Sequence, residues 1–236
     1  MVQELDLERL DERELNQRLQ ALVGSAEQVV LRNTHARHNI AVNIHGALDV
    51  VVQGSAGFYC CGFMNGPNVL VTGNVGWYAA DNMLGGKLIV QNNAGSNLAP
   101  SMIGGTVLVR GSAGSRVGYG LKGGTVIVCG SVGMLTGQQM LGGRIVLLNA
   151  VGTNTGESMY GGVIFFRRGA LAGAGSNVRV RAPEQTDLEA LEWLFAENNI
   201  RADPREFECL VPRTGKQSFH IFKPQFEKRE QVSEHL

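Results

Sequence analysis

Residues 104–133, GGTVLVRGSAGSRVGYGLKGGTVIVCGSVG, decide the fold of this 236-residue chain. A glycine pair starting at Gly104 is followed by the apolar run Val107–Val109, and the same pattern begins again nineteen residues later at Gly123. The stretch also contains Gly118, Gly120 and Gly123 in the spacing GxGxxG, the glycine fingerprint of dinucleotide-binding turns. These two patterns predict different proteins, one built on a structural repeat and the other on a phosphate-binding loop.

The repeat extends well beyond this stretch. Rows of nineteen residues align without a gap when they begin at Ala47, Gly66, Gly85, Gly104, Gly123, Gly142 and Gly161. Three consecutive positions are apolar in every row, from Val50–Val52 to Ile164–Phe166, and short β-branched runs bounded by glycine are typical of strands. Coils of a parallel β-helix stack at ~4.8 Å, so that equivalent positions lie above one another. We therefore predict an all-β parallel β-helix of about seven 19-residue coils over residues 47–180.

Two further columns of the repeat support this prediction. One column is expected to line the coil interior, because unbranched methionine fills narrow spaces well; it holds Met64, Met83, Met102, Leu121, Met140, Met159 and Val178. Another is expected to provide corners with positive φ; it holds Gly57, Gly76, Gly95, Gly114, Gly133 and Gly152. The GxGxxG glycines are interpreted as corners too, since no strand directly precedes them and no helix is predicted after them.

The regions outside the repeat carry helical patterns. Residues 1–28 are predicted to form an N-terminal helix, over residues 5–22, with a capping box at Asp11 and a stop at Gly24. Residues 29–46 form a lead-in segment to the first coil. Residues 181–236 are predicted to hold a second helix, from about Leu188 to Asn198, and an extended tail. Because a β-helix ends in open sheet edges, both helices are expected to cap or flank the coil.

Composition restricts the classes of function. Lys plus Arg and Asp plus Glu both number 21, so the chain lacks the basic surface of nucleic-acid-binding proteins. No apolar run is long enough to cross a membrane, and the acidic start, MVQELDLERLDEREL, does not resemble a signal peptide. The four cysteines, Cys60, Cys61, Cys129 and Cys209, lack zinc or redox spacing. We expect a cytoplasmic protein that neither binds nucleic acid nor enters a membrane.

Charged residues are distributed unevenly along the chain. Residues 47–160 contain eight of them, whereas the remaining 122 residues contain 34. A solvated β-helix would carry more charge on its outer faces, so this distribution predicts that much of the coil surface is buried against other proteins. A surface of uncharged polar residues, such as Gln91, Asn92 and Asn93, is the alternative.

Three histidines, His35, His38 and His45, lie close together in the lead-in segment. The spacing HxxH could bind a metal ion, but no carboxylate or cysteine accompanies these residues at ligand spacing. Local hydrogen bonding is therefore the preferred interpretation, and the individual roles of the three side chains stay open.

Other candidate groups also point away from chemistry. Cys60 and Cys61 align with two alanines in the next row, which indicates small buried residues rather than a nucleophile. Trp77 and Tyr78 occupy a turn position and are interpreted as contact residues. No catalytic, cofactor-binding or metal-binding residue is predicted on this chain.

The rows resemble the GXGXG domain family, which forms the last domain of the large subunit of glutamate synthase. The resemblance covers residues 29–180 and rests on the stacked pattern Gly-Gly-x-apolar-apolar-apolar followed by small-apolar-Gly. The lead-in NTHARHNIAVNIHG also looks like the family's segment Asn-x-Asp-Arg-x-x-Gly, although His35 stands where Asp is common and Asn39 stands near the glycine position. The resemblance implies a right-handed β-helix that serves as a free-standing subunit.

The resemblance also implies a function. The expected protein is a scaffold subunit, without its own active site, of N-methylglutamate synthase (methylamine-glutamate N-methyltransferase) or a related glutamate synthase. Such a hetero-oligomer would include a flavin-binding synthase subunit, with FMN and an iron–sulfur cluster, and a glutaminase-like amidotransferase subunit. The alternatives are the corresponding β-helix subunit of a formylmethanofuran dehydrogenase and, from a different class, a stand-alone ligand-binding β-helix.

Overall fold

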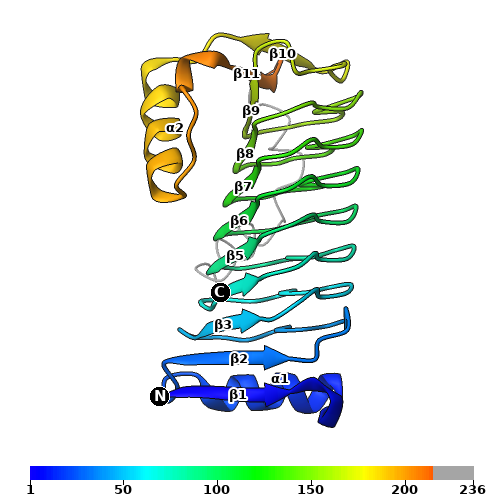
Figure 1. Cartoon of the computed structure of the whole chain (residues 1–236). Coiled ribbons are helices and arrows are strands. Elements are labelled where there is room, and N and C mark those ends of the chain that lie inside the picture. Colours follow the sequence, from blue (N-terminus) through cyan, green and yellow to red (C-terminus); the bar gives the residue numbers. More distant parts are fainter. Residues whose placement is uncertain (215–236) are drawn as a thin grey trace, which may run out of the picture.

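The computed structural model describes residues 1–214 and shows the chain as a stack of coils (Figure 1). One short parallel strand of each coil pairs with its equivalent nineteen residues later, for example Val50 with Val69 and Val69 with Leu88. These strands are β3 (Asp49–Val52), β4 (Asn68–Val71), β5 (Lys87–Val90), β6 (Thr106–Val109), β7 (Thr125–Val128), β8 (Arg144–Leu147) and β9 (Val163–Arg167). The predicted parallel β-helix and its period are confirmed.

The methionine column lies inside the coil, as predicted. Met64, Met83, Met102, Leu121 and Met140 are fully buried, and Met159 and Val178 are almost so. Each such side chain contributes about 1.5–3 kcal/mol by leaving water. The interior is therefore a continuous apolar column, and a single polar substitution in it would interrupt the packing of two neighbouring coils.

Each of the first six coils contains a turn in which every second residue adopts a left-handed conformation. In one coil these residues are Tyr59, Cys61 and Phe63, with φ of 59°, 61° and 56°. Their N–H groups bond alternately to the next and the previous coil: Tyr59 to Trp77 O at 3.0 Å, and Cys61 to Ile40 O at 2.9 Å. A left-handed conformation costs an L-residue about 1–2 kcal/mol, and the bonds between coils offset that cost.

The glycine column of the repeat serves close packing instead of positive φ. None of its six members has a positive φ, so the expectation of left-handed corners is wrong at these positions. A Cβ atom built on Gly114 would lie 2.7 Å from the backbone N of Ser96 and 2.9 Å from its Cα. Glycine is required here because the backbone of one coil passes too close to that of the preceding coil for any side chain.

A matched pair of substitutions tests this explanation. Gly114→Ala is expected to lower the free energy of unfolding by about 1–3 kcal/mol, since neighbouring backbone must move to admit a methyl group. Gly173→Ala is the control, because its Cβ would meet nothing nearer than 3.8 Å. Chemical denaturation of both variants provides the measurement. Equal stability of the two would contradict the packing role of the glycine column.

The N-terminal end of the stack is capped by α1 (Glu12–Leu22), which lies across the lead-in segment (Figure 1). Asn16 Oδ1 accepts a bond from Val42 N at 2.8 Å, and its Nδ2 donates to Asn39 O at 2.7 Å. Gln20 forms the equivalent pair with the backbone of His45, at 2.8 and 3.0 Å. These amides satisfy backbone groups of this turn segment that would otherwise pair with another coil.

The structure also shows a strand in the N-terminal region that the sequence pattern did not predict. Residues 5–22 were expected to be helical, but β1 (Val2–Asp6) extends the sheet and is followed by a 3-10 turn, Leu7–Arg9, before α1 begins. The side chain of Asp11 caps α1, accepting from Glu14 N at 2.7 Å. This is one half of the predicted capping box, because the Glu14 carboxylate pairs with Arg18 instead. β1 pairs in parallel with β2 (Gln28–Arg32), which in turn pairs with β3. Buried and exposed side chains do not alternate clearly in β1, because the strand lies at the edge of the sheet.

The C-terminal end is built differently. β10 (Val178–Arg181) leads into α2 (Gln185–Glu197), a 3-10 turn (Pro204–Glu206) and β11 (Phe207–Pro212), which inserts between β9 and β10 with antiparallel pairing on both sides. α2 begins three residues earlier than expected, with Glu184 and Asp187 forming its capping box. β11 was not predicted. The rest of the expected tail, 215–236, lies outside the described residues.

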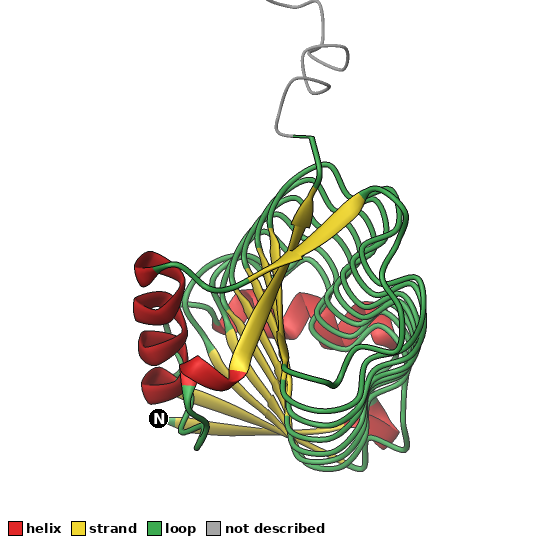
Figure 2. Ribbon diagram, turned by 90° about the horizontal axis from the view of Figure 1, so that it is seen from above, coloured by secondary structure: helices red, strands yellow, loops and turns green. Residues whose placement is uncertain are grey.

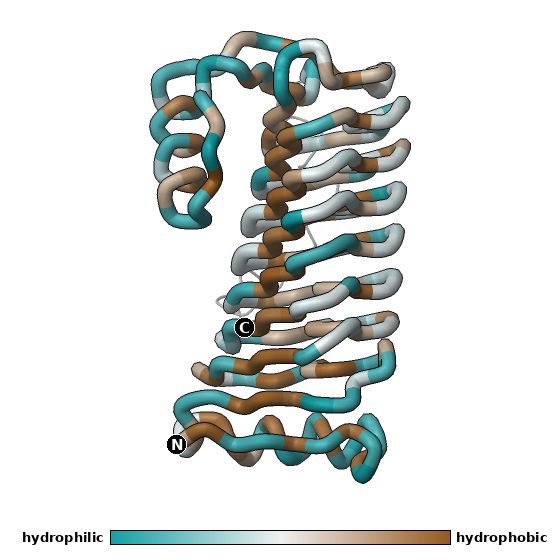
Figure 3. The backbone as a smooth tube through the Cα atoms, in the orientation of Figure 1, coloured by the Kyte–Doolittle hydropathy of each residue, from teal (hydrophilic) through white to brown (hydrophobic). Residues whose placement is uncertain are grey.

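α2 covers part of the outer face of the sheet (Figure 2). An apolar stripe follows the strands along the stack (Figure 3). Under α2 the stripe residues Leu108, Ile127 and Val146 are fully buried, and they pack with Leu191 and Leu194 of the helix. Part of the outer surface that was predicted to be buried is therefore covered by α2 of the same chain. Neither helix of the described residues is long and apolar enough to span a bilayer.

An ion pair fixes the start of α2 to the sheet. Arg181 Nη1 lies 2.5 Å from Asp187 Oδ2, which also accepts from Glu184 N at 2.8 Å. Burial alone would raise the pKa of Asp187, but the bonds from Arg181 and Glu184 hold it below the ordinary 3.8. Because the folded-state pKa is depressed, this carboxylate stabilises the fold above its ordinary pKa, and the contribution disappears as the pH falls through the folded-state value.

This linkage gives a pH prediction. Asp187→Asn should unfold at lower urea concentration than the wild type at neutral pH, and the difference should shrink as the pH falls below the ordinary carboxyl pKa. Glu192→Gln, an exposed position on the same helix, is the control and should follow the wild-type profile. Urea midpoints of the three proteins across this range provide the measurement. A constant difference between Asp187→Asn and the wild type would mean that its carboxylate is not the linked group.

Candidate functional site

The GxGxxG stretch has no free backbone donors for a phosphate. Gly118 N donates to Leu98 O and Gly120 N to Gln138 O, both at 2.8 Å, and Gly123 N donates to Met102 O at 3.1 Å. A dinucleotide-binding turn needs unpaired N–H groups at the start of a helix, whereas here a strand, β7, follows. Gly118 and Gly120 have positive φ of 65° and 61° and occupy two of the left-handed turn positions. These glycines therefore have a structural role in the coil and do not form a phosphate-binding loop.

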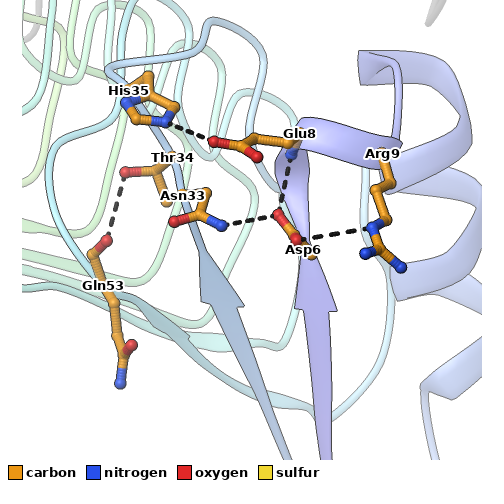
Figure 4. A network of polar contacts seen from close by, with 7 residues as sticks. All are labelled: Asp6, Glu8, Arg9, Asn33, Thr34, His35 and Gln53. Atoms are coloured by element: carbon orange, nitrogen blue, oxygen red, sulfur yellow. Dashed lines mark hydrogen bonds and ion pairs between the residues drawn. The ribbon is translucent and has the colours of Figure 1, made fainter.

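His35 takes part in a surface network rather than a ligand set (Figure 4). Its Nε2 lies 3.3 Å from Glu8 Oε1, and the preceding Asn33 donates to Asp6 Oδ1 at 3.0 Å. Bonds from Asn33 and from the backbone N–H of Glu8 lower the pKa of Asp6. The network joins the lead-in segment to the N-terminal region, so its role is to hold these two parts of the chain together.

The other two histidines have separate partners. His38 Nδ1 accepts from Phe58 N at 2.9 Å, and its ring stacks on that of Phe58 with centroids 4.6 Å apart. His45 Nε2 lies 3.0 Å from Asn43 Oδ1. The three histidines therefore do not converge, and residues 1–214 contain no cluster of three or more His, Cys, Asp or Glu side chains suited to a metal ion.

The cysteines are buried or half-buried thiols. Cys60 and Cys61 are both fully buried, with their sulfurs 3.6 Å apart. The hydrogen bond shared with Cys60, together with burial, raises the pKa of Cys61 well above its ordinary value. Burial and the nearby Asp187 raise the pKa of Cys209 to about 12. Because the thiolate is the reactive form, these environments suppress nucleophilic chemistry.

Exposed aromatic side chains gather on one corner of the stack. Phe58, Tyr59 and Trp77 are 40%, 41% and 52% exposed. The ring centroids of Phe58 and Trp77 lie 5.8 Å apart, and those of Tyr59 and Tyr78 lie 5.1 Å apart, in stacked geometry. Trp77 and Tyr78, interpreted from the sequence as contact residues, thus belong to two ladders of rings. We call these four residues the aromatic corner.

A polar hollow adjoins the aromatic corner. It has a volume of about 420 Å³ and is lined by Tyr78, Asn97, Arg116, Tyr119 and Gln138. Sequence reasoning missed the last four of these residues. They come from three coils and from two columns of the repeat, so only the stacking of coils brings them together. The one available signal was the shared column, since Tyr78, Asn97 and Arg116 follow one another at intervals of nineteen.

Two groups in the hollow lack partners within residues 1–214. Arg116 is exposed and forms no ion pair with any described carboxylate. The side-chain oxygen of Gln138, Oε1, is buried and has no hydrogen-bond donor among these residues. A buried acceptor without a donor costs free energy. The hollow and the aromatic corner are therefore a candidate binding surface.

Comparison with known proteins adds a family and a fold. The family model described as GXGXG motif matches residues 23–172. A search of curated proteins finds no match. Among solved structures, the chain is similar to one in the X-ray structure of the formyltransferase/hydrolase complex (FhcABCD) from Methylorubrum extorquens in complex with methylofuran, with a TM-score of 0.65, 18% identity and coverage of 86% of each chain. At that identity the likeness concerns the fold alone.

Thiol labelling tests the description of the cysteines. In the native protein Cys60, Cys61 and Cys209 are expected to resist a disulfide-exchange reagent, since they are buried and two of them have raised pKa values. Half-buried Cys129 should react slowly, and in denaturant all four should react. Cys129→Ser is the control and should abolish the slow native reaction. Rapid labelling of Cys60 or Cys61 would reveal an accessible thiol and contradict the structural role.

Proposed function

Because the chain belongs to the GXGXG motif family, we propose that it is a scaffold subunit of a multi-subunit enzyme and has no active site of its own. The observation that carries this proposal is that the chain's own polar groups are bonded to one another. The coil backbone is bonded from coil to coil, the glycine-rich loop has no free donors, and the histidines bind local partners. The surface that stays available is suited to binding proteins.

For the identity of the complex, we propose N-methylglutamate synthase. In the overall reaction the methylamino group of methylamine replaces the amino group of glutamate, which leaves as ammonia, and the product is N-methylglutamate. In this proposal FMN and the iron–sulfur cluster belong to a flavin-binding synthase subunit, and the complex also contains a glutaminase-like amidotransferase subunit. The lead-in segment and the acidic N-terminal region support this choice over other settings of the family.

A specific observation favours a second candidate. The structural relative belongs to a formyltransferase/hydrolase complex, and the two chains cover 86% of each other. A subunit of similar size and fold can thus work inside an assembly that handles formyl groups. A role in such an assembly is related to the alternative of a formylmethanofuran dehydrogenase subunit. Both candidates share the scaffold role and differ in the partners.

Co-purification of the tagged full chain from its native host tests the proposal. The expected result is a stoichiometric complex with a flavoprotein and a glutaminase-like subunit, identified by mass spectrometry. The isolated chain, prepared separately, should show no flavin absorbance and no turnover. Formyltransferase or hydrolase subunits in place of the flavoprotein would favour the second candidate. A monodisperse chain without partners that binds a small molecule would contradict both.

A further inference from the structure

The aromatic corner is confined to two successive coils. The rings stack along the axis of the β-helix, with His38 below Phe58 and with Tyr59 below Tyr78. At the next interval of nineteen the residues are Ser96 and Asn97, so the ladders end. The polar hollow lies where the rings end, and Tyr78 and Asn97 both line it.

The rings of the aromatic corner keep much of their surface free. Phe58 stacks on both His38 and Trp77, whereas Tyr59, Trp77 and Tyr78 each have one stacking partner, and Trp77 is 52% exposed. Large aromatic side chains bury much area against a protein surface at a low cost in conformational entropy. Such residues are enriched at the centres of protein–protein interfaces.

The hollow offers two kinds of group to a ligand. Arg116 can pair with an anion, and a guanidinium suits a planar carboxylate. Gln138 Oε1 needs a hydrogen-bond donor, because it is buried without one. A peptide that presents an Asp or Glu side chain offers both, since its carboxylate reaches the cation and its backbone N–H can donate to the amide.

A small free carboxylate would fit this surface less well. Arg116 is exposed, and ion pairs between exposed groups contribute little. The area that could make binding strong lies outside the hollow, over Phe58, Tyr59 and Trp77, and a small molecule in the hollow would not cover it. A segment of protein can fill the hollow and cover the rings together.

We propose that the aromatic corner and the hollow form one docking surface for an acidic segment of a partner subunit. The segment places an Asp or Glu side chain against Arg116 and packs apolar groups on Trp77 and its neighbours. The inference rests on the proposed scaffold function and specifies which part of the chain performs it. It also gives a role to the stacked aromatic side chains that lie together on two successive coils.

Matched variants of the tagged full chain test the surface in the native host. Trp77→Ala and Arg116→Glu are each expected to lower the recovery of one partner subunit at least tenfold, as quantified by mass spectrometry. Trp193→Ala, on α2, and Arg144→Glu, on β8, are the controls and should leave recovery unchanged, since both are exposed away from the hollow. Circular dichroism and thermal melting of the isolated variants should match the wild type.

Direct contact is tested by a photo-crosslinking amino acid at Tyr59, which should capture the same subunit whose recovery falls in Trp77→Ala. Normal recovery in both Trp77→Ala and Arg116→Glu would overturn the docking surface while leaving the scaffold proposal intact. Absence of any partner with the wild-type chain would overturn the scaffold proposal itself. Free glutamate titrated into the isolated chain, with NMR shifts that Arg116→Glu abolishes, would identify a small-molecule site and overturn the docking of a protein segment.

Discussion

Hydrogen bonding between successive coils is the constraint on which the rest of this structure depends. Because neighbouring strands must lie at a fixed distance of ~4.8 Å, every coil has to place its equivalent atoms directly above those of the last. The chain meets this demand with coils of equal length, glycine where two backbones approach, and left-handed residues where the turn must bond in both directions. The last coil shows that a local shift of one residue is tolerated. Val151 pairs with Leu171, one residue beyond the period of nineteen, whereas Thr155 pairs with Ala174 in register again.

The same constraint explains the two different caps. A stack of coils always ends in unpaired backbone groups, which would add further strands from other molecules. At the N-terminal end, the amides of Asn16 and Gln20 on α1 bond to these groups in place of another coil. At the other end, antiparallel β11 and β10 replace the parallel coil. At both ends the repeat is bordered by elements that do not share its pattern.

In this fold the backbone groups bond between coils and the interior is filled by apolar side chains. Binding therefore depends on the side chains at the corners of the coils. Neither the glycine-rich turn nor the buried thiols have groups to spare for chemistry, because the coil uses them. The corners are different, since large or charged side chains there can change from coil to coil without disturbing the stack. The aromatic corner, Arg116 and Gln138 are such additions, and they concentrate the binding capacity of the described surface in one place.

The period of nineteen in the sequence was sufficient to predict strands β3 to β9, their parallel pairing and the methionine interior, because equal spacing becomes vertical alignment in a β-helix. It did not reveal β1, β2, β10 or β11, which lie at the two ends of the sheet. Nor did it reveal the reason for the glycine at position 114, which depends on the distance to Ser96. The packing of α2 over Leu108 and Ile127, and the meeting of Tyr119 with Arg116, also had no linear signal. A repeat specifies how each coil relates to the next, whereas caps, coverings and surface clusters arise from contacts between residues that no fixed interval connects.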